Sequence, residues 1–135
     1  MEQADLRGDL MLKAMIAVAA ADGAVAPSEA GAIQRIYEER LGTPISRETI
    51  AKAAEANGRA SLLAELAAAA PALDRASKEE IICVAYLALL ADDRIAGEER
   101  KKLHDIAAAL KVPEIQFGAI LEDLAVSLAA GGSAR

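Results

Sequence analysis

One nine-residue segment occurs twice in this chain of 135 residues, and the duplication constrains the fold more than any other feature. Residues 21–29 read ADGAVAPSE and residues 91–99 read ADDRIAGEE, so the two copies lie 70 positions apart. Each copy follows a long apolar segment and precedes a segment with apolar residues at helical spacing. We therefore expect two helix–acidic loop–helix hairpins whose apolar first helices pack against each other. Two copies predict a duplicated globule, because a solenoid needs about three repeats.

The composition and periodicity predict helices throughout. Alanine supplies 34 residues, and it is the strongest helix former and is depleted in strands. Ser46 and the pair Ser77–Glu80 are predicted to cap the third and fifth helices at their N-termini. The sequence thus predicts a compact all-α bundle of about seven helices in one domain, residues 1–130, with a disordered tail at 131–135. The expected helices cover residues 4–21, 27–41, 46–56, 61–70, 77–91, 97–110 and the segment from 113 onward.

Charge and cysteine content exclude several classes of protein. Fifteen Lys and Arg residues against 21 Asp and Glu residues give a net charge of −6, which disfavours nucleic-acid binding. One Cys and one His exclude a disulfide framework and a zinc site built only from Cys and His. No basic segment precedes an apolar run at the N-terminus, so no secretory signal is expected. The apolar runs 14–21 and 81–91 fall short of the ~20 residues of a membrane-spanning helix, so we expect a cytoplasmic location.

The duplicated loop has a purely structural interpretation. Gly23 and Asp93 suit the left-handed position that ends a helix. Val25 and Ile95 are expected to fill the hairpin with apolar side chains. On this interpretation the loop is a hairpin motif without a ligand.

The same spacing also overlaps half of a calcium loop. Asp-Gly-x-Val-x-x-x-Glu matches the fifth to twelfth positions of an EF-hand. The first and third ligand positions would fall on residues without a side-chain oxygen, which excludes a true EF-hand. Those residues are Val18 and Ala20 in one copy, and Ala88 and Leu90 in the other.

A different metal geometry remains open beside the structural interpretation. If the two loops lie close together, four carboxylates can converge on one cation. They are Asp22, Glu29, Asp92 and Glu99. Ligands that are all oxygen favour Ca²⁺, Mg²⁺ or Mn²⁺ over softer metals. Unpaired carboxylates at short distance repel each other, so a bound cation would relieve that repulsion.

Other residues give little support for catalysis. His104 follows Arg100, Lys101 and Lys102 and is expected on a solvated helix face, and Cys83 is expected to be a small buried apolar residue. No nucleophile–base pair is evident, so we expect a non-enzymatic protein without a catalytic residue or an organic cofactor. Two alternatives remain: a metal-dependent hydrolase that uses the same carboxylates, or a structural dimerisation module.

The repeated segment resembles the signature of the TerB family, the all-helical proteins associated with tellurite resistance. The resemblance rests on Ala-Asp-Gly-x-Val-x-x-x-Glu at 21–29, its second copy at 91–99, and the segment 106–112 followed by a helix that carries Phe117. It covers about residues 10–124, and the same fold occurs in a membrane-anchored DnaJ-type co-chaperone. Asp93 departs from the pattern, since it stands where the second copy would have Gly.

The resemblance implies a helical accessory or interaction domain that is linked to tellurite or another stress response. It implies a protein partner, with a membrane-associated complex near the inner membrane as one setting, and a monomer or homodimer as the oligomeric state. Carried over to this chain, the suspected metal ligands of the family correspond to Asp22, Glu29, Asp92 and Glu99.

Overall fold

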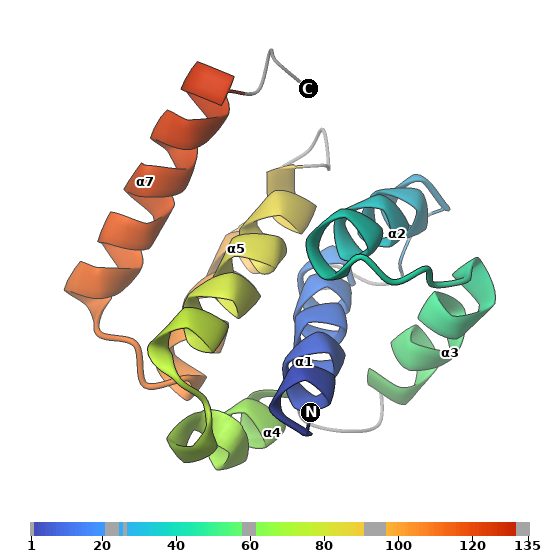
Figure 1. The fold of residues 1–135 in the computed structure, drawn as a ribbon, viewed down its shortest axis with the longest axis horizontal. Coiled ribbons are helices and arrows are strands. Elements are labelled where there is room, and N and C mark those ends of the chain that lie inside the picture. The colour runs from blue at the N-terminus through green and yellow to red at the C-terminus, as the bar shows by residue number, and fades with distance from the viewer. Residues whose placement is uncertain (1, 21–24, 26, 58–61, 91–96, 132–135) are drawn as a thin grey trace.

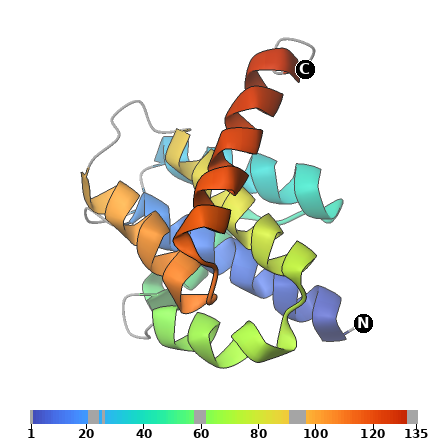
Figure 2. The same cartoon turned by 90° about the vertical axis from the view of Figure 1, so that its left-hand side faces the viewer.

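The two apolar segments that precede the acidic loops form the central helices of the computed structural model. They are α1 (Glu2–Ala19) and α5 (Arg75–Leu90), which pack against each other more extensively than any other pair of helices. Both views show them side by side and running in the same direction (Figures 1 and 2). Met11, Met15 and Ile82 are fully shielded from solvent on these helices. The predicted packing of the two first helices is confirmed.

The structure describes residues 2–20, 25, 27–57, 62–90 and 97–131. Within these ranges it contains seven α-helices, one 3₁₀ turn and no strand, which confirms the all-α prediction. The remaining elements are α2 (Pro27–Leu41), α3 (Arg47–Asn57), α4 (Leu62–Ala69), the 3₁₀ turn Ala70–Ala72, α6 (Gly97–Ala109) and α7 (Glu114–Gly131). None of the helices in these ranges is apolar over a length that would cross a bilayer.

The duplication in sequence is also a duplication in structure. The second helix of each hairpin, α2 or α6, packs against the central helix that precedes it. Ile33 of α2 and Leu103 of α6 lie 70 positions apart, and both are buried, as are Ile36 and Ile106. Val25 is half-buried and packs against the core, as predicted, whereas Gly23, Asp93 and Ile95 lie outside the described residues.

In the first half, α3 closes over the hairpin and packs against both α1 and α2. Its N-terminus begins as predicted, because the Ser46 hydroxyl oxygen accepts a hydrogen bond from the Thr49 amide at 3.1 Å. Ile50, one residue further on, is buried in the core. A single local cap thus sets the point at which α3 turns its apolar face inward.

Polar contacts also fix α3 to α2. Gln34 donates a hydrogen bond from Nε2 to the carbonyl oxygen of Ile45 at 2.7 Å and accepts one at Oε1 from Arg47 Nε at 3.1 Å. The Ile45 amide in turn donates to Glu38 Oε2 at 3.1 Å. Gly31 leaves room for the guanidinium group, since an added Cβ there would lie 2.9 Å from Arg47 Nη2. The connection between α2 and α3 is therefore pinned by side chains from both helices.

The predicted capping box of α5 is wrong. α5 begins at Arg75, and the Ser77 amide donates a hydrogen bond to Asp74 Oδ1 at 2.8 Å, so Asp74 is the N-cap. Ser77 itself is buried within the helix, and Glu80 accepts a hydrogen bond from Arg40 Nη1 at 3.3 Å. In a capping box the Glu80 carboxylate would accept the hydrogen bond of the Ser77 amide. In the structure Asp74, three residues before Ser77, accepts it instead, and the spacing of Ser77 and Glu80 did not distinguish these two possibilities.

The last helix leaves the body of the molecule at a sharp turn. The α6 segment ends in a Schellman motif, in which the amide of Val112 donates to the Ala107 carbonyl and that of Lys111 to the Ala108 carbonyl. Lys111 takes the left-handed position usually filled by glycine, with φ of 65°. α7 then packs mainly against α5 through Phe117 and Ile120, and its C-terminal half extends beyond the other helices (Figure 2). Of the predicted tail, residues 132–135 lie outside the described residues.

Candidate metal site at the loop end

The four helix ends that flank the two acidic loops lie at one end of the molecule. α1 and α5 run in the same direction, so their C-termini finish on the same side, and α2 and α6 begin there (Figures 1 and 2). We call this side the loop end. The condition set by the sequence was that the two loops lie close together; the helix ends beside the loops share this side, and the loops themselves lie outside the described residues apart from Val25.

The structure describes one of the four predicted ligand side chains. Glu29 lies in the first turn of α2 and is half-buried. Glu99 lies in the first turn of α6, but its side chain is outside the described part, as are Asp22 and Asp92. The prediction that these four carboxylates share a cation therefore stays a prediction. Among the side chains that are described, no group of three His, Cys, Asp or Glu residues is close enough to hold a metal ion.

The helix termini at this end carry partial charges of both signs. Helix C-termini carry partial negative charge on their unpaired carbonyl groups. Two such termini meet at the loop end, and neither α1 nor α5 has a basic residue in its last turn. In the sequence, Asp22 follows α1 and Asp92 follows α5 within three residues. The N-termini of α2 and α6 lie at the same end and carry partial positive charge, so the four helix dipoles offset each other, and a preference for a positive ligand would come from the acidic residues of the sequence.

Glu29 fits both interpretations of the loop. A carboxylate in the first turn of a helix is stabilised by the positive end of the helix dipole, with or without a metal. The donor set as a whole is made of carboxylate oxygens, which suits a hard divalent cation.

Of the two residues with the usual chemistry of catalysis, His104 is exposed on α6, as predicted, and Cys83 is half-buried on α5. His104 stacks edge-on against Phe117, with ring centroids 4.8 Å apart. Burial raises the pKa of the Cys83 thiol to about 11, and the nearby charge of Glu80 adds to the shift. The thiol is therefore protonated at neutral pH, which opposes a role as nucleophile. The prediction for Cys83 holds in part, because the residue is half-buried rather than fully buried.

Two grooves on either side of α7 were not predicted from the sequence. The α6–α7 groove has a volume of about 290 Å³ and the α5–α7 groove about 210 Å³. The first is lined by Tyr86, Leu89, Leu90, Leu103, His104, Phe117 and Leu121. The second is lined by Arg75, Glu79, Cys83, Gln116, Ala119, Ile120, Asp123, Leu124 and Ser127. The apolar residues of α7 can be recognised in the sequence. The grooves on its two sides cannot, because they depend on the angle at which α7 leaves α6.

An ion pair between α1 and α4 was also missed. Lys13 Nζ lies 2.7 Å from Glu65 Oε1 and 3.1 Å from Asp9 Oδ2. The hydrogen bond to Glu65 raises the pKa of Lys13 most strongly, against the opposing effect of burial. The contact joins residues 52 positions apart, and helical periodicity carries no signal for such a pairing.

An all-α bundle built on a duplicated helix–acidic loop–helix hairpin defines the structural class of this protein. A family profile described as "Tellurite resistance protein TerB" matches residues 9–122, a range that includes both hairpins. The chain belongs to the TerB family. Searches of curated proteins and of solved structures gave no match to this chain.

Proposed function

We propose that this protein is a non-enzymatic accessory domain that binds a divalent cation at the loop end and acts through a protein partner. The observation that carries the proposal is the arrangement of α1 and α5, whose C-termini finish on the same side of the molecule. The proposed ligands are Asp22, Glu29, Asp92 and Glu99, and the proposed ions are Ca²⁺, Mg²⁺ and Mn²⁺.

The non-enzymatic part of the proposal rests on the chemistry of the side chains. The chain has a single His and a single Cys. The His104 ring packs against Phe117, and burial keeps the Cys83 thiol protonated. A nucleophile–base pair therefore has few candidates, and the duplicated carboxylates are better suited to holding an ion than to acid–base chemistry on their own.

Thermal unfolding of the metal-free protein tests the proposal. The parent is titrated with Ca²⁺, Mg²⁺, Mn²⁺ and Zn²⁺ beside the double variant Asp22→Ala/Asp92→Ala. A ligand that binds only the folded state at 100 times its Kd adds about 2.7 kcal/mol, which corresponds to a rise in Tm of about 10 °C. We expect this rise in the parent with at least one hard cation and not in the double variant.

A second double variant, Glu48→Ala/Glu122→Ala, is the matched control, since it removes two exposed carboxylates from α3 and α7. It should respond to the cation as the parent does. No rise at millimolar cation, or equal rises in the parent and the Asp22→Ala/Asp92→Ala variant, would reject the metal site. Metal-dependent phosphoester hydrolysis that is lost in that variant would support the hydrolase alternative instead.

The proposal extends to tellurite or another stress response, because the family description names tellurite resistance. Growth of a tellurite-sensitive bacterial strain that expresses the parent or the Asp22→Ala/Asp92→Ala variant tests this part. We expect protection by the parent and less protection by the variant. Equal growth with the parent and with an empty vector would contradict the link to tellurite.

A further inference from the structure

The last helix, α7, is held to the molecule mainly along one face of α5. The α5 residues that line the grooves beside α7 recur every three or four positions and so share one face of the helix; they include Glu79, Cys83, Tyr86 and Leu90. The α7 residues that pack against the core recur at the same helical spacing, and they are Phe117, Ile120, Leu121 and Leu124. We call this face of α5 the α7 seat. The contact is therefore one helix laid along another.

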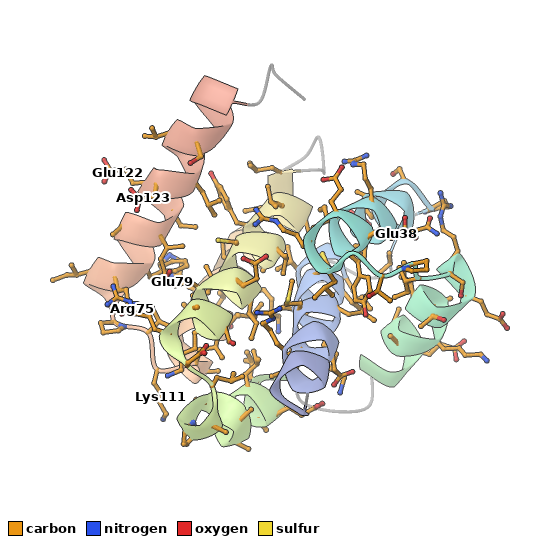
Figure 3. All side chains as sticks on the ribbon, in the orientation of Figure 1. Glu38, Arg75, Glu79, Lys111, Glu122 and Asp123 are labelled. Carbon is orange, nitrogen blue, oxygen red and sulfur yellow. The ribbon has the colours of Figure 1, made fainter. Side chains whose placement is uncertain are left out.

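Apolar packing fixes α7 on its seat more than polar contacts do. Phe117 and Ile120 are buried, with 4% and 8% of their surface exposed. The hydrogen bond from Gln116 to Glu79 is 3.5 Å long, which is weak, and Figure 3 shows Glu79 on the side of α5 that faces α7. Burial of apolar surface depends on the area covered. The seat would therefore bind the same residues equally well if α7 came from another copy of the chain.

The connection that keeps α7 in its own chain is short and conformationally costly. Only residues 110–113 lie between α6 and α7. Lys111 has a φ of 65°, and among the described residues no other residue except glycine has a positive φ. A side chain is disfavoured in this left-handed region, because Cβ comes too close to the following carbonyl oxygen. Short connections under strain favour exchange of the element that they hold, since an open connection releases the strain.

The sequence of the turn also favours an extended form once it opens. Pro113 disfavours the helical conformation for Val112, and a proline inside a continuous helix removes one hydrogen bond and clashes with the preceding turn. Opening therefore gives two helices joined by an extended segment. The three residues 111–113 span at most about 11 Å when extended. Two copies could exchange α7 only if they meet through the ends that carry these turns.

An exposed apolar side chain lies at that end of the molecule. Figure 1 shows the start of α7 at the end opposite the loop end, and Figure 3 places Lys111 there. Ile115 is the second residue of α7, and 89% of its surface is exposed. A contact between two copies through this end would cover Ile115, which a single copy leaves in water.

We propose that two copies of this chain exchange α7. The α7 of each copy occupies the α7 seat of the other, and residues 111–113 cross between the copies in an extended conformation. The exchange is isologous, as the twofold symmetry of a dimer requires. It repeats in each copy the packing of α7 on α5 that the structure shows within one chain. The inference does not depend on the acidic loops or on a bound cation.

Cross-linking across the seat distinguishes an exchanged dimer from any other dimer. The full chain is refolded from urea in EDTA at about 1 µM and at about 1 mM, and monomer and dimer are separated by size exclusion. In a Cys83→Ala background, Glu79→Cys and Gln116→Cys place one thiol on each helix, since these two side chains are in contact. A short bismaleimide then links the two thiols.

Denaturing gel electrophoresis shows which chains are linked. We expect links within one chain in the monomer fraction and links between two chains in the dimer fraction. A dimer fraction that is linked only within single chains would overturn the exchange, because each α7 would then lie on its own seat. A monomer at both concentrations would overturn it as well.

Two variants of Lys111 should move the equilibrium in opposite directions. Lys111→Gly suits the left-handed position and should raise the dimer Kd. Lys111→Val opposes that position and favours the extended form, because its side chain is β-branched, and should lower the Kd. We expect the two Kd values to differ by at least about tenfold. Both variants remove the same charge, so each is the control for the other, and equal Kd values would contradict the role of the turn.

The exposed residues of α7 locate the contact. Ile115→Gln should raise the dimer Kd by about fivefold or more without lowering the monomer Tm, because the side chain is exposed in the monomer. Val126→Gln is the matched control, since Val126 is exposed near the far end of α7, and it should leave the Kd unchanged. A larger effect of Val126→Gln would place the contact along the outer face of α7 and overturn the exchange. A cross-linked dimer in EDTA with no cation-dependent rise in Tm would reject the metal site and leave the exchange standing.

Discussion

The two halves of the molecule begin alike and end differently. Each half starts with an apolar helix, α1 or α5, followed by an acidic loop and an amphipathic helix, α2 or α6. In the first half the next long helix, α3, packs against both members of its hairpin. In the second half α7 packs mainly against α5 and leaves a groove on each side.

The polar contacts of α3 and α7, which we call the two closing helices, show the same difference. Arg47 and the backbone of Ile45 fix α3 to Gln34 of α2 through hydrogen bonds of 2.7 and 3.1 Å. α7 is joined to α5 by a hydrogen bond from Gln116 to Glu79 of 3.5 Å, which is long for a strong interaction. In the first half, α3 therefore covers both helices of the hairpin, whereas in the second half α7 covers mainly α5 and leaves grooves beside it.

The largest expected effect is on the free energy of unfolding, and it compares the central helices α1 and α5 with α7. Ile82→Ala removes a fully buried side chain between the central helices and should lower the free energy of unfolding by about 2–5 kcal/mol. Leu124→Ala on α7 should cost about half as much or less, because Leu124 is only partly buried. Urea unfolding measures both values. Equal losses would show that α7 is as integral to the core as α5 and would break the comparison.

The next effect concerns the reactivity of Cys83 in the α5–α7 groove. With a pKa of about 11 instead of 9, the thiolate fraction at pH 8 falls about 100-fold. Labelling by a disulfide reagent should be slower than in the unfolded chain by a similar factor. Because unfolding lowers this pKa, the thiol should also reduce folding stability as the pH rises from 9 towards 11.

Variants of the two closing helices sharpen this measurement. Leu124→Ala should accelerate Cys83 labelling, because it loosens the helix that covers the thiol. Ile50→Ala on α3 should leave the labelling rate close to that of the parent in the native state. The opposite ranking would mean that Cys83 is protected by the first half rather than by α7.

A smaller effect distinguishes the caps of α3 and α5. Ser46→Ala should cost about 1 kcal/mol at any pH, because the cap is a neutral hydroxyl. The hydrogen bonds from Ser77 hold the pKa of Asp74 below its usual value, so its stabilising effect is present above pH ~4 and is lost as the pH falls through the lowered pKa. The Tm difference between the parent and Asp74→Ala should therefore shrink in acid. A constant difference down to pH 2 would contradict the role of the carboxylate.

The smallest effect compares two inter-helix contacts. A double-mutant cycle on Lys13 and Glu65 should give a coupling energy of about 0.5 kcal/mol, since the pair is partly exposed. The same cycle on Gln116 and Glu79 should give a value close to zero, because the hydrogen bond is long. A larger coupling for the second pair would mean that α7 is fixed more firmly than its geometry indicates.

Much of the fold could be predicted because it depends on local chemistry. The duplication and the helical periodicity predicted the central position of α1 and α5, and Val25 packs inward as expected. Ser46 caps α3 because its own hydroxyl reaches the free amide. The cap of α5 was assigned wrongly because Asp74 and Ser77 are both good N-cap residues, and only the buried position of Ser77 decides between them.

Features that depend on distant contacts could not be predicted in the same way. The ion pair of Lys13 with Glu65 and the grooves beside α7 follow from the relative placement of helices, and a single sequence does not carry that information. For the candidate metal site, the sequence left open whether the two loops lie close together; the four helix ends that flank them lie on one side of the molecule. The positions of Asp22, Asp92 and the Glu99 side chain lie outside the described residues.

The central claim is that both halves contribute to one cation site, and paramagnetic broadening by Mn²⁺ tests it most directly. Amide signals of the ¹⁵N-labelled protein are followed while Mn²⁺ is added below the protein concentration. The account predicts that signals at the end of α1 and at the end of α5, such as Ala20 and Leu90, broaden together and recover together when Mg²⁺ or Ca²⁺ is added in excess. Broadening at one helix end alone, or strongest broadening at the exposed acids Glu122 and Asp123 of α7, would contradict it.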